Sequence, residues 1–225
     1  MIKAVLFDLD DTLYDEKQFV KGGFKAVSQY ISEKYGVNKN TFYQTLLDVL
    51  RKEGRGHTFD IALKIFGLYK KELIPKLVKI YREHNPQLSL FPDAFVVLSR
   101  LKKDYKLGLI TDGNERVQRK KIQALGIKDY LDIIIFTHKY GEGKQKPNPF
   151  PYQKAMKKLS IKSREAIYVG DDPCKDFIGA KRLGMYTIRV LRGKYKNIRL
   201  DKTFEADYEV ENLEEIDRLI KRKIL

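Results

Sequence analysis

The chain begins with an apolar run that stops at a cluster of carboxylates. Residues 4–7 are apolar and β-prone, which predicts one buried strand. Asp8-Leu9-Asp10-Asp11-Thr12 follows directly, and carboxylates crowded at a strand end repel one another unless a cation or hydrogen-bond donors offset their charge. Residues two apart can aim at one point, so Asp8 and Asp10 can work as a pair. The plainer alternative is an acidic turn that caps the next helix.

Beyond this cluster, apolar positions recur at helical spacing and no strand pattern interrupts them until residue 88. Thr58 has a side chain suited to the N-cap of the third helix of this stretch. The expected helices are 18–35, 41–52, 58–66 and 72–84. We interpret residues 16–88 as a separate helical bundle inserted after the first strand.

From residue 89 onward, strand and helix patterns alternate along the chain. The expected strands are 106–110, 133–136, 166–169, 186–191 and 208–210. The expected helices are 93–103, 116–125, 150–159, 174–183 and 213–223. Alternation of this kind predicts an α/β fold, a Rossmann-like parallel sheet with helices on both faces. Residues 1–15 and 89–225 would form this core domain, and residues 16–88 the inserted α-helical bundle.

Length and composition narrow the class of protein. At 225 residues the chain can bury a proper core, and no apolar run approaches the roughly 20 residues of a membrane helix. Asp8 interrupts the first apolar stretch before a signal peptide can form. The single cysteine, Cys174, excludes an internal disulfide and fits a reducing compartment. We therefore expect a cytoplasmic protein, monomer or homodimer, with no membrane partner.

The formal net charge of +15 raises the question of a nucleic-acid partner. The lysines are spread over the whole length and interleaved with Asp and Glu, and no nucleic-acid motif is present. We expect no specific nucleic-acid partner and some steering of anionic substrates. A basic module that binds polyanions without catalysis remains an alternative.

Polar clusters end three of the predicted strands. They are Asp8 with Asp10, Thr111-Asp112-Gly113-Asn114, and Gly170-Asp171-Asp172 with Asp176 behind. Ligands of an open α/β sheet bind outside the carboxyl ends of the strands, so neighbouring strands would bring these clusters to one edge.

A lysine and a set of carboxylates suggest the chemistry of this edge. Pro147 disfavours helical backbone at Lys146, so an extended loop is expected there, and Lys144 is a rival anchor. Oxygens of Asp8, Asp10 and Asp171 suit a hard cation such as Mg²⁺. A lysine beside a turn rich in backbone N–H groups would hold an anion. Together these groups indicate phosphoryl transfer.

In this order the motifs resemble those of the haloacid dehalogenase superfamily. They are DLDDT at 8–12, TDG at 111–113, the lysine of KPNP at 146, and GDDPCKD at 170–176. The chain is similar to the phosphatases of this superfamily that carry a helical cap after the first motif, and the resemblance spans essentially its whole length. It implies that residues 16–88 are the cap and that the substrates are small phosphate monoesters, such as sugar phosphates or nucleotides.

The resemblance also implies roles at the first motif. Asp8 would be the nucleophile that forms an aspartyl-phosphate intermediate, and its carboxylate would also bind Mg²⁺. Asp10 would give its backbone carbonyl to the metal and keep its side chain as general acid and then general base.

The remaining motifs would bind phosphate and metal. Thr111 and the neighbouring Asp112 and Gly113 would hold the phosphoryl oxygens, mainly through backbone amides. Lys146 would neutralise charge on the nucleophile and the phosphoryl group. Asp171 would complete the metal shell, and the resemblance leaves open whether two further carboxylates bind the metal through water or only support it and the lysine. These two are Asp172 and Asp176.

Several alternatives stay open on the residues alone. A phosphoglucomutase-like activity would use the same core residues, and a phosphonatase would need a cap lysine that forms a Schiff base. Dehalogenase chemistry is disfavoured, because halide release does not need the acid–base function of Asp10. Arg55 and His57, on a glycine-flanked loop of the cap, are candidates for contact with the substrate, and a solvated loop is their plainer interpretation.

Overall fold

A computed structural model describes residues 1–221 of the chain. The chain divides into two compact units. One unit combines Met1–Glu16 with the segment that begins at Ser89, and the other is Lys17–Leu88. No helix within the described part of the chain is long and apolar enough to cross a membrane.

The first unit is built on a parallel sheet of six strands in the described residues. Their order is β3-β2-β1-β4-β5-β6, which puts the first strand in the middle, between β2 and β4. The bounds are β1 Ala4–Phe7, β2 Lys106–Thr111, β3 Ile133–Phe136, β4 Ala166–Gly170, β5 Tyr186–Val190 and β6 Tyr208–Val210. Every residue of β1 is buried, as expected for a central strand covered on both faces.

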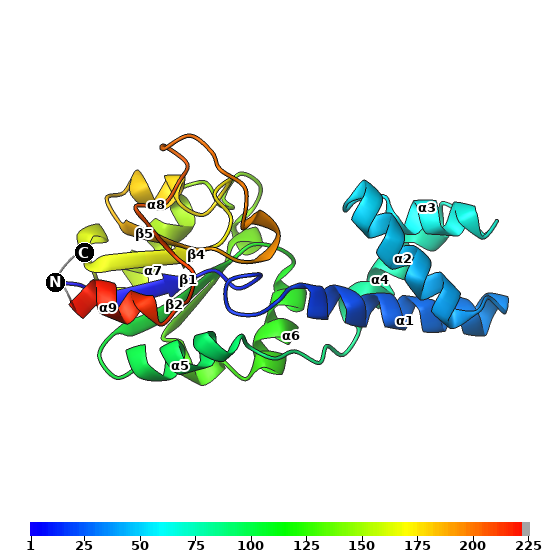
Figure 1. Cartoon of the computed structure of the whole chain (residues 1–225), viewed down its shortest axis with the longest axis horizontal. Helices are drawn as coiled ribbons and strands as arrows, with labels where there is room; N and C mark the ends of the chain where they lie inside the picture. The colour runs from blue at the N-terminus through cyan, green and yellow to red at the C-terminus, as the bar shows by residue number, and fades with distance from the viewer. Residues whose placement is uncertain (222–225) are drawn as a thin grey trace. The chain divides into compact units, whose positions relative to one another are not determined.

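Helices cover both faces of this sheet. Their bounds are α5 Pro92–Leu101, α6 Glu115–Leu125, α7 Phe150–Leu159, α8 Ile178–Lys181 and α9 Glu215–Lys221. Tyr152 of α7 and Ala180 of α8 share an apolar cluster with Leu6 of β1. Figure 1 shows α5 and α6 on the opposite face. The predicted Rossmann-like α/β fold is confirmed.

Short elements complete this unit in the described residues. Four 3-10 helices are present: η1 Lys128–Tyr130, η2 Thr137–Tyr140, η3 Ser163–Glu165 and η4 Gly193–Tyr195. Gly126 ends α6 in the left-handed conformation (φ 66°), where its missing Cβ avoids strain. The end predicted for the last helix, residue 223, lies outside the described residues.

The helix predicted over residues 174–183 is too long at both ends, because α8 covers only Ile178–Lys181. The preceding residues form a loop held by carboxylates. Asp172 accepts a hydrogen bond from the Cys174 N–H at 2.9 Å, and Asp176 accepts one from the Asp172 N–H at 3.0 Å. These side-chain bonds close the loop that precedes α8.

The second unit contains four helices: α1 Lys17–Tyr35, α2 Lys39–Glu53, α3 Thr58–Ile65 and α4 Leu73–Glu83. Their apolar faces enclose a separate core in which Phe24 and Ile31 of α1 pack with Phe42 of α2 and Leu77 of α4. The helical spacing of these residues in the sequence produces that shared face. Asn38 caps α2 by accepting a hydrogen bond from the Thr41 N–H at 3.0 Å.

Thr58 does not cap α3 as predicted. His57 occupies the N-cap position without a side-chain capping bond, and Thr58 is the first helical residue. The Thr58 hydroxyl donates to the carbonyl oxygen of Gly54 at 3.3 Å. It therefore satisfies an acceptor at the end of the preceding helix instead of an amide of its own.

Candidate active site

Strand register brings three of the predicted motifs to one edge of the sheet. Phe7, the last residue of β1, pairs with Leu109 of β2 and with Val169 of β4. The residues that follow these pairs therefore emerge side by side at the carboxyl end of the sheet. Asp8 continues this arrangement, because its N–H donates to the Val169 carbonyl at 2.9 Å. The crevice outside strand ends, next to a central strand, is where open α/β sheets bind ligands.

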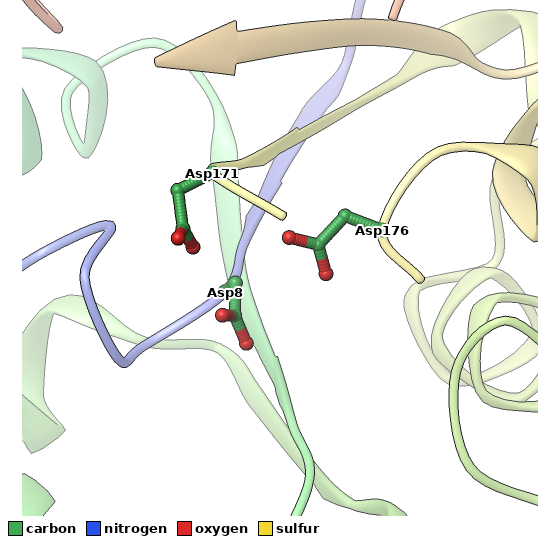
Figure 2. A group of neighbouring side chains, drawn as sticks. All are labelled: Asp8, Asp171 and Asp176. Atoms are coloured by element: carbon green, nitrogen blue, oxygen red, sulfur yellow. The ribbon is translucent and has the colours of Figure 1, made fainter. Parts of the chain in front are cut away.

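Three buried carboxylates gather at this edge. Asp8, Asp171 and Asp176 each offer one oxygen, and these oxygens lie within 4.8 Å of one another. Figure 2 shows that they come from the end of β1, the end of β4 and the loop that follows β4. The third member of the group is thus Asp176, for which the sequence leaves open a metal contact through water or a supporting role. The Asp10 side chain makes other contacts.

Lys146 neutralises part of this charge. Its buried Nζ lies 2.6 Å from Asp8 Oδ1, 2.7 Å from Asp176 Oδ1 and 2.9 Å from the Tyr168 hydroxyl. Its backbone is in a tight turn, with a cis bond to Pro147, closed by a hydrogen bond from the Asn148 N–H to the Gln145 carbonyl at 2.8 Å. Lys146 therefore lies in a loop between the 3-10 helix η2 and α7.

The rival anchor, Lys144, has different surroundings. It is exposed, and its Nζ lies 5.0 Å from the centre of the Phe150 ring. Lys146 is only 5% exposed and lies against Asp8.

Burial strongly affects protonation at this edge. It raises the pKa of Asp8 from 3.8 to about 7, although the charge of Lys146 acts in the opposite direction. Burial, with the charges of Asp176 and Asp8, raises the pKa of Asp171 well above its usual range. Burial works against the Lys146 ammonium, but the same two carboxylates outweigh it and raise its pKa. One ammonium therefore does not offset all of the negative charge.

A divalent cation fits the remaining charge. Both oxygens of Asp176 already accept hydrogen bonds, from Lys146 and from the Asp172 N–H. Asp8 and Asp171 are thus the carboxylates best placed to hold a cation, and oxygen donors of this kind suit Mg²⁺. The Thr12 hydroxyl donates to Asp171 Oδ1 at 3.0 Å and orients that carboxylate.

Asp172 and Asp176 lie where they can support this arrangement. Asp176 connects the loop after β4 to Lys146, while the carboxylate of Asp172 accepts from the Cys174 N–H and lies 3.8 Å from Lys175. Gly170 leaves room for this loop, because a Cβ at that position would lie 2.4 Å from Asp176 Oδ2.

The Asp10 side chain is held by three donors. The Tyr14 hydroxyl and Lys121 Nζ reach its Oδ1 at 2.5 and 2.6 Å, and Gln118 Nε2 reaches its Oδ2 at 3.0 Å. Burial opposes the charged form, but the charge of Lys121 and these hydrogen bonds outweigh it and lower the pKa of Asp10. Sequence reasoning missed Gln118 and Lys121, whose only signal is that they are polar and one helical turn apart on α6.

The turn after β2 is linked to Asp10 through Gln118 and to the backbone of Lys146 through Asp112. The Thr111 hydroxyl accepts a hydrogen bond from Gln118 Nε2 at 2.5 Å. Asp112 Oδ1 accepts from the Thr137 hydroxyl at 2.6 Å and from the Lys146 N–H at 3.3 Å, so its side chain holds the lysine turn. Gly113 adopts φ 112°, a conformation that side chains with a Cβ rarely accept.

The two cap residues predicted to contact substrate are placed differently within the helical unit. Arg55 lines a pocket of this unit together with Phe24, Phe59 and Tyr81. His57 is exposed at the start of α3.

The comparison with known proteins agrees with this geometry. A sequence model described as haloacid dehalogenase-like hydrolase matches residues 5–190. The chain belongs to this family. It is 34% identical over 229 residues to a glyceraldehyde 3-phosphate phosphatase from Methanocaldococcus jannaschii, with 98% of each chain covered. Full-length similarity at this level confirms the predicted enzyme class, a phosphoric monoester hydrolase of this family.

Solved structures of the same family have the same fold. A phosphatase of this family from Thermococcus onnurineus is 28% identical with a TM-score of 0.65, and the match covers 97% of this chain and 98% of that one. A 2-haloacid dehalogenase from Pseudomonas syringae is 26% identical with a TM-score of 0.69, covering 99% and 100%.

Proposed function

We propose that the chain is a Mg²⁺-dependent phosphatase that hydrolyses small phosphate monoesters through an aspartyl-phosphate at Asp8. The observation that carries the proposal is the position of the Lys146 ammonium, 2.6 Å from Asp8 and within the same buried group of carboxylates. An ammonium in this place opposes the protonation that burial favours at the attacking carboxylate, and it also offers charge to a bound phosphoryl group.

The metal would be held by the carboxylates of Asp8 and Asp171 and by the backbone carbonyl of Asp10. The burial of Asp8 and Asp171 and the charge that remains unbalanced support this assignment. When bound, Mg²⁺ supplies positive charge that offsets the charge of the nucleophile and the phosphoryl oxygens.

The covalent step uses one carboxylate as nucleophile and another for proton transfer. The pKa of Asp10 is lowered in the free protein, so its carboxylate would first take up a proton from solvent as the negative charge of the substrate arrives. An oxygen of Asp8 then forms a bond to phosphorus while the ester P–O bond breaks, and the leaving oxygen takes this proton from Asp10. Water then attacks the aspartyl-phosphate, gives its proton to Asp10 and releases phosphate, which restores both carboxyl groups.

Phosphate binding would come from the turn after β2 and from Lys146. The Thr111 hydroxyl and the backbone amides of Asp112 and Gly113 would bind the phosphoryl oxygens. The side chain of Asp112 would contribute indirectly, since it holds the backbone of Lys146.

The helical unit would act as the cap that selects the substrate. Residues 16–88 would open and close over the site, with Arg55 and His57 as candidate contacts. A cap over the site favours small phosphate esters over protein substrates. Glyceraldehyde 3-phosphate is the first compound to test, because full-length relatives at 34% identity carry that name.

The test compares wild type with Asp8→Asn, using p-nitrophenyl phosphate and glyceraldehyde 3-phosphate, with Mg²⁺ or with EDTA. The matched control is Asp104→Asn, which removes an exposed carboxylate. We expect turnover that needs Mg²⁺, that falls by about 10³ or more in Asp8→Asn and that is kept in the control. Turnover that survives in Asp8→Asn would refute the covalent mechanism. Absence of turnover with either ester would contradict the phosphatase assignment and leave the polyanion-binding alternative.

A further inference from the structure

Two buried side chains of α6 reach the carboxylate of Asp10, more than 100 residues away in the sequence. Gln118 Nε2 lies 3.0 Å from Asp10 Oδ2, and Lys121 Nζ lies 2.6 Å from Asp10 Oδ1. The two residues are three apart on the helix, so they project from the same face. They are only 2% and 4% exposed.

Gln118 also contacts the turn that the proposed function assigns to phosphate. A side-chain amide has two N–H donors, and Nε2 reaches both Asp10 Oδ2 and the Thr111 hydroxyl, the latter at 2.5 Å. One side chain thus ties the proton-transfer group to the phosphate-binding turn. A displacement of either partner changes the hydrogen bonding of the other.

Stability alone does not account for these two residues. Lysine and glutamine are seldom buried in a helix that covers a sheet, and taking them out of water is costly. Replacing a buried ion pair by well-packed apolar side chains is often neutral or stabilising. An apolar face on α6 would therefore serve the fold at least as well, which points to a role in the reaction.

We propose that Gln118 and Lys121 are positioning residues, which hold the Asp10 carboxyl group in one orientation beside Thr111. This inference rests on the proposed function. Asp10 gives a proton to the leaving oxygen and later receives one from water, and both transfers need a hydrogen-bond geometry fixed to a fraction of an ångström. Lys121 would hold one carboxyl oxygen, and Gln118 would set its distance from the bound phosphoryl group.

The test compares two phosphate esters whose leaving groups differ in their need for a proton from Asp10. Lys121→Met and Gln118→Met are compared with wild type on two esters, glycerol 3-phosphate, whose alkoxide needs a proton, and 2,4-dinitrophenyl phosphate, whose phenolate does not. We expect kcat/KM for the alkyl ester to fall by about 10- to 100-fold and that for the activated ester by less than about 3-fold. Lys157→Met, an exposed position on α7, is the control and should change neither.

A second arm asks whether the effect passes through Asp10. In an Asp10→Asn background, Lys121→Met and Gln118→Met should cost no further activity, because residues that act through one group are not additive. Two variants are used so that poor folding of one, seen as a lowered Tm, does not decide the result.

Each outcome is distinguishable. Equal losses with both esters, or losses that add to those of Asp10→Asn, would mean a structural role and overturn the inference while leaving the phosphatase assignment intact. A wild-type protein without Mg²⁺-dependent turnover of either ester would overturn both. Unchanged kcat/KM in both variants would overturn the inference alone.

Discussion

The buried carboxylates predict an unusual dependence of stability on pH and metal. In the metal-free protein, burial raises the pKa of Asp8 from 3.8 to about 7. The folded state therefore holds this proton more tightly than the unfolded state does. Its contribution to stability is fully present below about pH 4 and is lost as the pH rises toward 7. Asp171, whose pKa is also raised, acts in the same direction.

The size of the effect follows from the pKa of Asp8. A difference of about 3 pH units corresponds to about 4 kcal/mol in total, at roughly 1.4 kcal/mol per unit. Between about pH 5.5 and 7, half of that range is crossed, so Asp8 alone lowers the free energy of unfolding by about 2 kcal/mol. For a chain of this length, that is a decrease in Tm of about 4–8 °C.

The assay is thermal unfolding in EDTA and in excess Mg²⁺ at both pH values. A cation binds the ionised carboxylates in competition with protons, so we expect Mg²⁺ to raise Tm more at the higher pH and to flatten the profile. Asp171→Asn should lose most of the Mg²⁺ effect, while Asp104→Asn, at an exposed position, should retain it. A metal-free Tm that does not change between the two pH values would refute the reasoning, as would an equal Mg²⁺ shift at both.

Three further outcomes follow from particular contacts. Lys146→Met should lower kcat by about 10²–10³, whereas Lys144→Met, at the exposed position, should keep wild-type turnover. Burial opposes the charged form of Asp93, but its bonds to Arg192 outweigh burial and lower its pKa. The stability that ionised Asp93 contributes should therefore vanish as the pH falls below about 4. In an acid titration of Tm, Asp93→Asn should lack this decrease. Gly179→Ala should cost about 1–3 kcal/mol in urea unfolding, because its Cβ would lie 2.3 Å from a backbone oxygen of the lysine turn; an unchanged midpoint would contradict this.

Much of the secondary structure was readable from local patterns. The strands Ile133–Phe136 and Tyr208–Val210 and the helix Phe150–Leu159 have the predicted bounds, because their apolar periodicity and their end signals agree. The helix predicted from Cys174 begins four residues late, after a loop in which the Asp172 and Asp176 carboxylates accept hydrogen bonds from backbone N–H groups. Local periodicity carries no information about these bonds.

The candidate site likewise contains residues that the sequence motifs predict and residues that only the tertiary structure shows. The motif residues Asp8, Lys146 and Asp171 were predicted because their types and spacing match a known set, and the structure brings them together at one edge. Their roles in the reaction stay predictions. Gln118 and Lys121 belong to no motif of that set, and only the packing of α6 reveals their contact with Asp10.

The sequence by itself determined the α/β class, the helical segment after the first strand and the candidate residues of the site. Each of these depends on short-range periodicity or on residue type, which are properties of the chain itself. Only the tertiary structure decided the strand order, the place of Asp176 beside Lys146, and the hydrogen bonds that orient Asp10. These depend on distances between residues far apart in sequence, and such distances arise only when the sheet and its helices pack together.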